Sequence, residues 1–152
     1  MAEHDELRDL AARLAVGQVV IRYGQLLDDH RWDEFGELFT ADGVWRTADV
    51  TLQGRSEIVE GLRRMQGPRP GSVKHLSFPP VIELDPPDGA RAWTDFVCVL
   101  FAEGAWSVVS GGRYSDRLAL DDGRWRIASR DADVQGPTER VLPAGWRPTS
   151  AS

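Results

Sequence analysis

The spacing of apolar residues changes once along the chain, near Ser72, from a helical period to a strand period. Before this point apolar residues recur every three or four positions, as they do on the buried face of a helix. After it they alternate with polar residues, as on a strand that buries one face. Helices followed by consecutive antiparallel strands are typical of an α+β domain. We expect a strongly curved antiparallel sheet wrapped around the N-terminal helices, a cone whose open end is a pocket.

Three helices are expected in the first half of the chain. The longest covers residues 6–27, where apolar positions follow two helical tracks: Leu7, Leu10 and Leu14, then Val16, Val19, Tyr23 and Leu26. A second helix over residues 32–39 is expected to stop around Asp42-Gly43, before a short strand over residues 44–47. The third helix covers residues 55–65 and is followed by a loop rich in Gly and Pro.

Four strands are expected in the second half. Alternating patterns cover residues 73–84, 90–101, 106–120 and 124–134. Asp88-Gly89 and Asp122-Gly123 favour tight hairpin turns between them, because Gly tolerates positive φ. Pro79-Pro80 cannot donate ladder hydrogen bonds, so the first strand is bulged or lies at an edge there. We expect one domain over residues 1–152, with a core over residues 6–134 and an extended tail over residues 135–152.

Composition and charge limit the partners of the chain. With 18 Lys+Arg against 24 Asp+Glu, the formal net charge is −6, which argues against binding to a nucleic acid backbone. The longest apolar stretches are too short to span a bilayer, and the acidic N-terminus has no feature of a signal peptide. We therefore expect a cytoplasmic protein without a membrane partner. One cysteine and three histidines cannot build a Cys/His zinc cage, so no metal is expected.

A histidine and two neighbouring carboxylates are candidates for an acid–base pair. His75 lies inside a strongly patterned strand, and it serves as a base only if a carboxylate orients its ring. Asp28 and Asp29 are the candidates, although an Asp between two helices commonly serves as a cap. Tyr23, near the end of the same long helix, is either a core residue or a hydrogen-bond donor to a developing oxyanion. Spacing in the sequence does not decide which Asp faces His75.

Further candidates lie on the strands. One inward arginine would stabilise an anionic intermediate, and the candidates are Arg113, Arg117, Arg126 and Arg130. Asp95 stands between apolar residues, and burial would raise the pKa of its carboxyl group. Cys98 is more typical of a small core hydrophobe than of a nucleophile. Trp45 is one of several tryptophans that supply more aromatic bulk than a small core needs, although each one is individually expected in the core.

Several segments resemble a known family, and they occur in the order of that family. They are YGQLLD at residues 23–28, WDEF at residues 32–35, LFTADGVW at residues 38–45, GRSEI at residues 54–58, KHL at residues 74–76, GRYSDRL at residues 112–118 and DGRWRI at residues 122–127. Over residues 6–134 the chain resembles SnoaL-like proteins of the nuclear transport factor 2-like superfamily. The resemblance implies a cone-shaped α+β barrel with an apolar pocket, and a homodimer or homotrimer.

The resemblance also implies a site. Asp28 matches the family's Asp late in the first helix, His75 matches its His on the first long strand, and Tyr23 matches a tyrosine that often assists. Arg130 is the nearest match to an arginine at the end of the last strand. The residues expected to bind substrate are Arg130, Trp45 and Asp95. Enzymes of the family include scytalone dehydratase, ketosteroid isomerase and polyketide cyclases, and they generally work without a cofactor.

We therefore expect a cofactor-independent lyase or isomerase, a dehydratase or cyclase, acting on a hydrophobic cyclic small molecule such as a polyketide- or steroid-like intermediate. His75, held by Asp28, would remove a proton next to a carbonyl or a leaving group, and Tyr23 would stabilise the charge that develops on oxygen. Two alternatives stay open. One is an epoxide hydrolase of the same fold, in which Asp95 matters more than His75. The other is a non-catalytic ligand-binding or subunit-association module.

Overall fold

The computed structural model describes residues 1–66 and 69–135, in which three helices and seven strands follow one another. The helices are α1 (Ala2–Asp28), α2 (Trp32–Gly36) and α3 (Arg55–Met65). The strands are β1 (Phe39–Arg46), β2 (Thr51–Gln53), β3 (Val73–Ser77), β4 (Val81–Asp85), β5 (Gly89–Ala102), β6 (Ala105–Asp121) and β7 (Arg124–Gln135). Most of the tail expected over residues 135–152 lies outside the described residues. No helix in this part of the chain is long and apolar enough to cross a membrane.

The strands form one curved sheet with the order β2-β1-β7-β6-β5-β3, in which β4 also pairs with β5. Neighbouring strands are antiparallel except for β1 and β7, which run parallel. The expected α+β class is confirmed, whereas the expectation of an antiparallel sheet throughout is wrong at this one pair. The long stretch of chain between β1 and β7, which includes α3, allows β7 to return in the same direction as β1.

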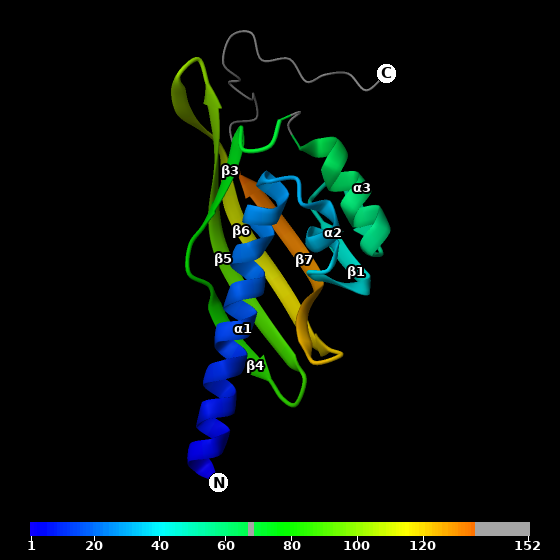
Figure 1. Cartoon of the computed structure of the whole chain (residues 1–152), viewed down its shortest axis with the longest axis vertical. Helices are drawn as coiled ribbons and strands as arrows, with labels where there is room; N and C mark the ends of the chain where they lie inside the picture. Colours follow the sequence, from blue (N-terminus) through cyan, green and yellow to red (C-terminus); the bar gives the residue numbers. More distant parts are fainter. Residues whose placement is uncertain (67–68, 136–152) are drawn as a thin grey trace.

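Helix α1 lies across one face of the sheet, and its N-terminal turns extend beyond the sheet (Figure 1). The sheet covers the second half of the helix, where Val16, Val20 and Tyr23 are almost fully buried. The first apolar track of the same helix is more than half exposed, although its spacing is that of a buried face; its members are Leu7, Leu10 and Leu14. The helical spacing of apolar residues therefore predicted the helix α1, but it did not show which part of the helix packs on the sheet.

Most predicted elements are confirmed, and the larger differences lie around the second helix and at Pro79-Pro80. Helix α3 has the predicted bounds, and strands β5, β6 and β7 agree with the prediction within two residues at each end. Pro79 and Pro80 divide the strand predicted over residues 73–84 into β3 and β4, because neither can donate to a ladder. The second helix ends at Gly36, since β1 already begins at Phe39, and β2 has no counterpart in the prediction.

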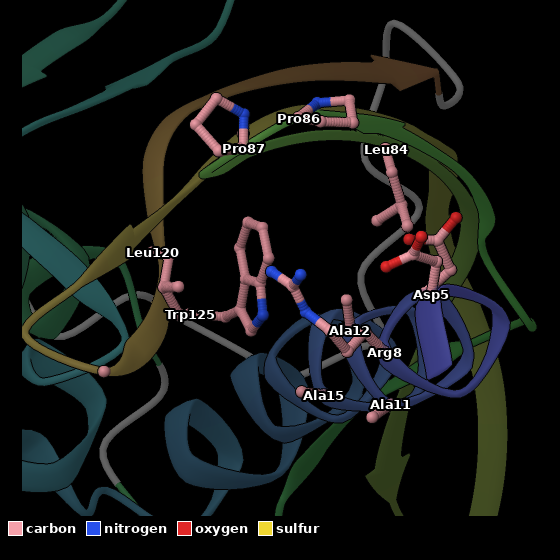
Figure 2. A pocket seen from close by; sticks show the side chains of 13 residues that line it. Asp5, Arg8, Ala11, Ala12, Ala15, Leu84, Pro86, Pro87, Leu120 and Trp125 are labelled. Carbon is pink, nitrogen blue, oxygen red and sulfur yellow. The ribbon is translucent and has the colours of Figure 1, made fainter. Parts of the chain in front are cut away.

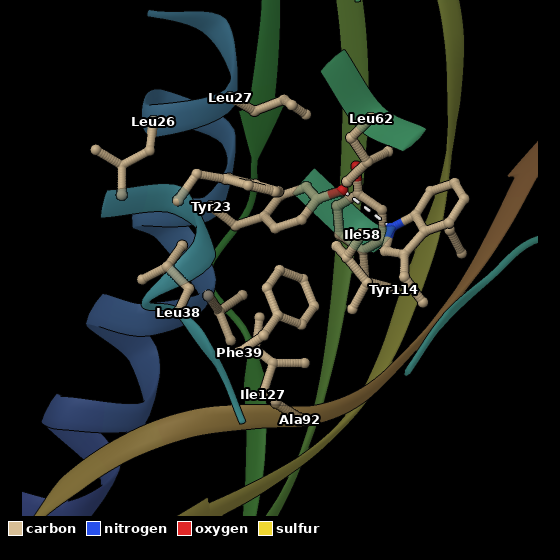
Figure 3. Packing of buried hydrophobic residues seen from close by; sticks show 14 of the residues in the cluster. Tyr23, Leu26, Leu27, Leu38, Phe39, Ile58, Leu62, Ala92, Tyr114 and Ile127 are labelled. Atoms are coloured by element: carbon tan, nitrogen blue, oxygen red, sulfur yellow. Dashed lines mark hydrogen bonds between the residues drawn. The ribbon is translucent and has the colours of Figure 1, made fainter. Parts of the chain in front are cut away.

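Alternate residues of the long strands point toward α1 and form the core, part of which Figure 3 shows. Every second residue along the middle of β5 is buried, as expected for a strand with one face on the core. On the neighbouring strands β1, β7 and β6, the register places Trp45, Arg130 and Asp116 side by side. A polar cluster therefore lies inside the apolar core, next to Tyr23 of α1.

Candidate active site

The end of α1 meets the edge strand β3, and this contact joins Asp28 to His75. Asp28 Oδ1 lies 2.6 Å from His75 Nδ1, and the backbone N–H of His75 donates to Asp28 Oδ2 at 2.8 Å. An edge strand leaves N–H groups without a strand partner, and here one carboxylate satisfies both the backbone and the ring of His75. Asp29 is exposed instead and lies 3.4 Å from the Lys74 ammonium group. The structure therefore places Asp28, and not Asp29, beside the histidine.

Gly24 lets α1 approach β3 this closely. A Cβ atom at this position would lie 2.9 Å from the carbonyl oxygen of His75 and 3.1 Å from its Cβ atom. Distances this short would force the helix and the strand apart. Gly24 lies about one helical turn before Asp28, so it sets the distance across which the Asp28 carboxylate reaches the His75 ring.

Replacing Gly24 by alanine is expected to destabilise the protein by about 1–3 kcal/mol, because overpacking outweighs the roughly 1 kcal/mol that alanine gains in a helix. The matched control is Gly17→Ala on the same helix, where a Cβ atom would meet nothing closer than Ile82 Cδ1 at 3.8 Å. That variant is expected to gain up to about 1 kcal/mol of stability. Urea denaturation followed by circular dichroism measures both, and effects of the same sign would contradict a tight contact at Gly24.

The surroundings of His75 favour its protonated form. Burial by itself lowers the pKa of the imidazole, but the hydrogen bonds and charges of Asp28 and Cys98 raise it to about 9. Cys98 is the register partner of His75 on β5, so the thiol and the ring lie on the same face of the sheet. At neutral pH His75 and Asp28 therefore form an imidazolium–carboxylate pair, and the ring becomes a neutral base as the pH rises toward 9.

Tyr23 points into the core, and its hydroxyl stays protonated there. Its oxygen accepts a hydrogen bond of 3.0 Å from Trp45 Nε1, the dashed line in Figure 3. The ring packs against Phe35 and Tyr114, with ring centroids 5.1 and 5.5 Å away. Burial raises the pKa of Tyr23 to about 12, although Arg130 and the bond from Trp45 act in the opposite direction. The phenol is thus a neutral hydrogen-bond donor at physiological pH.

A buried ion pair packs against the Tyr23 ring. Arg130 on β7 and Asp116 on β6 are register partners, and two hydrogen bonds of 2.7 and 2.6 Å join the guanidinium to the carboxylate. The guanidinium carbon lies 3.9 Å from the centre of the Tyr23 ring and 4.1 Å from that of Tyr114. Arg130 is fully buried and Trp45 nearly so. Both residues, which are expected to bind substrate, contact Tyr23 in this structure.

Asp95 lies outside this cluster. Its side chain is 55% exposed, and its Oδ1 lies 2.6 Å from Arg113 Nε. The hydrogen bond from Arg113 lowers the pKa of the Asp95 carboxyl group. The expectation of a buried carboxyl with a raised pKa is therefore wrong, because Asp95 shares the outer face of β5 with Trp93 and Val97. Asp95 and Arg113 instead line a separate hollow of about 490 Å³, of which neither Asp28 nor His75 is part.

Two neighbours of the candidate site left only weak signals in the sequence. Asp116 follows Tyr114 by two positions on β6, so both point to the buried face, where a carboxylate needs a partner. The alternation along β6 could have identified Asp116, but its partner on β7 depends on the register. Cys98 is buried in the core as expected, and its place beside His75 depends on the pairing of β3 with β5. Within residues 1–66 and 69–135, no three metal-ligating side chains come together.

Three hollows lie along α1, and the one lined by Gln18, Val19 and Trp125 borders neither Asp28 nor His75. A groove of about 510 Å³ runs between the exposed side of α1 and β3, and its lining includes Asp28, Asp29, Lys74 and His75. A hollow of about 610 Å³ lies at the N-terminal half of the helix, where alanines of α1 face Trp125 and the prolines after β4 (Figure 2). None of the candidate site residues lines this second hollow. The helical rise separates its Ala12 from Asp28 by about 24 Å, so the groove is the hollow that borders His75.

Solved structures share this fold. An NTF2-like protein with a cystatin-like fold from Novosphingobium aromaticivorans is 21% identical to this chain, with a TM-score of 0.75 over 86% of each chain. A scytalone dehydratase-like protein of the same organism is 17% identical, with a TM-score of 0.71 over 91% of this chain and 97% of that one. A protein of Catenulispora acidiphila, solved in complex with S-DNPA, is 26% identical, with a TM-score of 0.71 over 82% of this chain and 94% of that one.

Sequence comparison identifies the family to which the chain belongs. No curated protein matches the chain at a significant level. The SnoaL-like domain, by contrast, matches residues 8–131, which include both Asp28 and His75. This match covers most of the chain, and the fold agrees with it from α1 to β7. The protein therefore belongs to the SnoaL-like domain family.

Proposed function

We propose that the protein is a cofactor-independent lyase or isomerase, in which His75 and Asp28 move a proton of a cyclic ketone. The observation that carries this proposal is the 2.6 Å contact between His75 Nδ1 and Asp28 Oδ1. Because Nδ1 is bound to the carboxylate, Nε2 is the ring nitrogen that would act on a substrate. Membership of a family that includes dehydratases and cyclases supports the same chemistry.

Dehydration illustrates the role of each residue. Neutral His75 removes a proton from the carbon next to the carbonyl, and the electrons of that C–H bond form the enolate. Tyr23 donates a hydrogen bond to the oxygen on which negative charge develops. The carbonyl then re-forms as the β-carbon loses its hydroxyl group, which takes the proton of the His75 imidazolium and leaves as water. Asp28 keeps the ring oriented and stabilises the imidazolium that forms between these steps.

The charges around the candidate site favour an uncharged substrate. Asp28 pairs with His75 and Asp116 pairs with Arg130, so each of these buried charges has an opposite partner. A permanent charge placed beside Tyr23 would meet a pair whose charges already cancel. A neutral ketone develops charge only during the reaction, next to Tyr23. The Catenulispora acidiphila structure in complex with S-DNPA supports a small molecule as the ligand.

The test uses a hydroxytetralone, a bicyclic β-hydroxy ketone, in heavy water. Nuclear magnetic resonance follows deuterium uptake next to the carbonyl, and ultraviolet absorbance follows elimination to a naphthol. We expect the wild-type protein to accelerate both processes relative to buffer, and Asp29→Asn to behave like the wild type. No acceleration of either process would contradict the acid–base proposal. Binding of the ketone without turnover would then favour the ligand-binding module.

A further inference from the structure

The Asp116–Arg130 ion pair is fully buried in the core. Neither side chain has exposed surface. Replacement of a buried ion pair by well-packed apolar side chains is often neutral or even stabilising, because two charges must lose their hydration in the pair. In addition, Arg130 Nη1 has no hydrogen-bond partner among the described residues. Stability alone therefore does not account for a charge pair at this position.

The pair makes its closest aromatic contacts with the two tyrosines. The guanidinium of Arg130 contacts both tyrosine rings, at 3.9 Å from the centre of Tyr23 and 4.1 Å from that of Tyr114, and the two rings also contact each other with centroids 5.5 Å apart. Trp45 Nε1 donates a hydrogen bond of 3.0 Å to the Tyr23 oxygen. Tyr23 is thus fixed at its ring by a cation and at its oxygen by a donor. Its own O–H proton has no hydrogen-bond acceptor among the described residues.

The charged and titratable groups that face Tyr23 come from β6 and β7. Burial is the main reason that the pKa of Tyr23 is raised; Arg130 lowers this pKa, and Asp116 raises it again. Tyr114, which contacts both the Tyr23 ring and the guanidinium, is itself protonated because burial raises its pKa well above the usual value. Helix α2 and strand β1 contribute aromatic neighbours, namely Phe35, Phe39 and Trp45. Asp116 and Arg130 therefore act on Tyr23 in opposite directions.

We propose that Asp116 and Arg130 are positioning residues for Tyr23: the guanidinium fixes the phenol ring, and Asp116 cancels its charge, so that a neutral, oriented hydroxyl meets the substrate oxygen. The inference rests on the proposed function, because it concerns the proton donor of that reaction. Without Asp116, the unpaired guanidinium would make Tyr23 a stronger acid. Without both residues, the ring would lose the contact that orients its hydroxyl.

A titration of Tyr23 tests the effect of the pair without any substrate. The protein has two tyrosines, so in a Tyr114→Phe background the absorbance of tyrosinate reports Tyr23 alone. In this background Tyr23 is expected to titrate near 12. Adding Asp116→Asn is expected to lower that midpoint by about one pH unit or more. An unchanged midpoint, in a variant that circular dichroism shows to be folded at each pH, would overturn the proposal.

The matched control for this titration is Asp95→Asn. Asp95 accepts the same two hydrogen bonds from Arg113, across the pair of strands β5 and β6, but on the exposed face of the sheet. Its loss is expected to leave the titration of Tyr23 unchanged. An equal shift in both variants would show an effect of net charge alone and would overturn the proposal.

A second variant covers the case in which Asp116→Asn does not fold. Combining Asp116→Leu with Arg130→Met replaces the pair by apolar side chains, and we expect this variant to keep most of the wild-type stability. Deuterium exchange of hydroxytetralone is nevertheless expected to slow by about tenfold or more. Wild-type exchange in a stable double variant would show a purely structural pair and overturn the proposal. If the wild type itself shows no exchange, the proposed function fails, and the Tyr23 titration alone decides the inference.

Discussion

Replacing Arg130 by methionine is expected to lower the free energy of unfolding by about 3–5 kcal/mol, because a buried carboxylate then loses its partner. Asp116 accepts both of its side-chain hydrogen bonds from Arg130, at 2.7 and 2.6 Å, and has no exposed surface from which water could replace them. The substitution also removes the cation that contacts the rings of Tyr23 and Tyr114. Urea denaturation at neutral pH, followed by tryptophan fluorescence, measures the loss.

Two comparisons separate the buried charge from a general loss of packing. Arg113→Met breaks the exposed pair with Asp95, whose side chains are 59% and 55% exposed; it is expected to change stability little, because surface pairs contribute little. Adding Asp116→Leu to Arg130→Met is expected to restore most of the lost stability, because the unpaired charge is gone. Equal losses for Arg130→Met and Arg113→Met would show that burial of the pair has no energetic consequence.

Replacing His75 by glutamine, or Asp28 by asparagine, is expected to slow the proposed proton transfer by about 10²–10⁴-fold. The first variant removes the base. The second removes the charged acceptor on His75 Nδ1, but an amide oxygen can still accept the backbone N–H of His75, so the local structure is expected to remain. Deuterium exchange of hydroxytetralone measures both variants. Asp29→Asn is the matched control, and a similar loss in that variant would contradict the assignment of Asp28.

The pH dependence of the same reaction tests the identity of the base. The pKa of His75 is raised to about 9, so the wild-type rate is expected to rise about tenfold per pH unit above neutrality and to level off near that value. In Asp28→Asn the hydrogen bond that raises this pKa is lost, so the rate is expected to level off at a lower pH. A wild-type rate that does not change over this range would contradict His75 as the base.

Stability should follow the same titration. The folded-state pKa of His75, about 9, lies above the value of about 6.5 for an unfolded histidine, so the folded protein binds this proton more tightly. The resulting contribution to stability is complete below about pH 6.5 and is lost as the pH rises through about 9. The wild-type free energy of unfolding is expected to fall over this interval, and most of the fall should be absent in Asp28→Asn.

Local pattern predicted the elements that bury a single face. Helix α3 and the long strands β5, β6 and β7 each place apolar residues on one side, so period and turn residues were enough to find them. The beginning of β1 was missed, because the apolar residues Phe35, Leu38 and Phe39 also fit a helical period. The parallel pairing of β1 with β7 joins segments far apart in the chain, and no local pattern carries that information.

The outer face of the sheet shows why Asp95 was misplaced. On β5, Trp93 and Val97 are half-buried on the outer side, while Phe96 and Cys98 are buried on the inner side. Both faces of the strand are therefore apolar, and alternation alone did not identify the face that α1 covers. Asp116 differs from Asp95 in the opposite sense. Its neighbours in the sequence are polar, yet its side chain points to the core, where Arg130 of the neighbouring strand donates to it.

Local sequence was sufficient for the class of the fold, for the ends of α3 and for the residue types of the candidate site, since period, turn residues and side-chain chemistry act over a few positions. Only the packing of α1 against β3 shows which of Asp28 and Asp29 lies beside His75. Consecutive residues on a helix point about 100° apart, so only one of the two side chains can face β3. The close approach at Gly24 brings Asp28 within hydrogen-bond distance of His75. The partners of Tyr23 depended on packing as well, because strand register alone brings Trp45, Arg130 and Asp116 together from three separate segments of the chain.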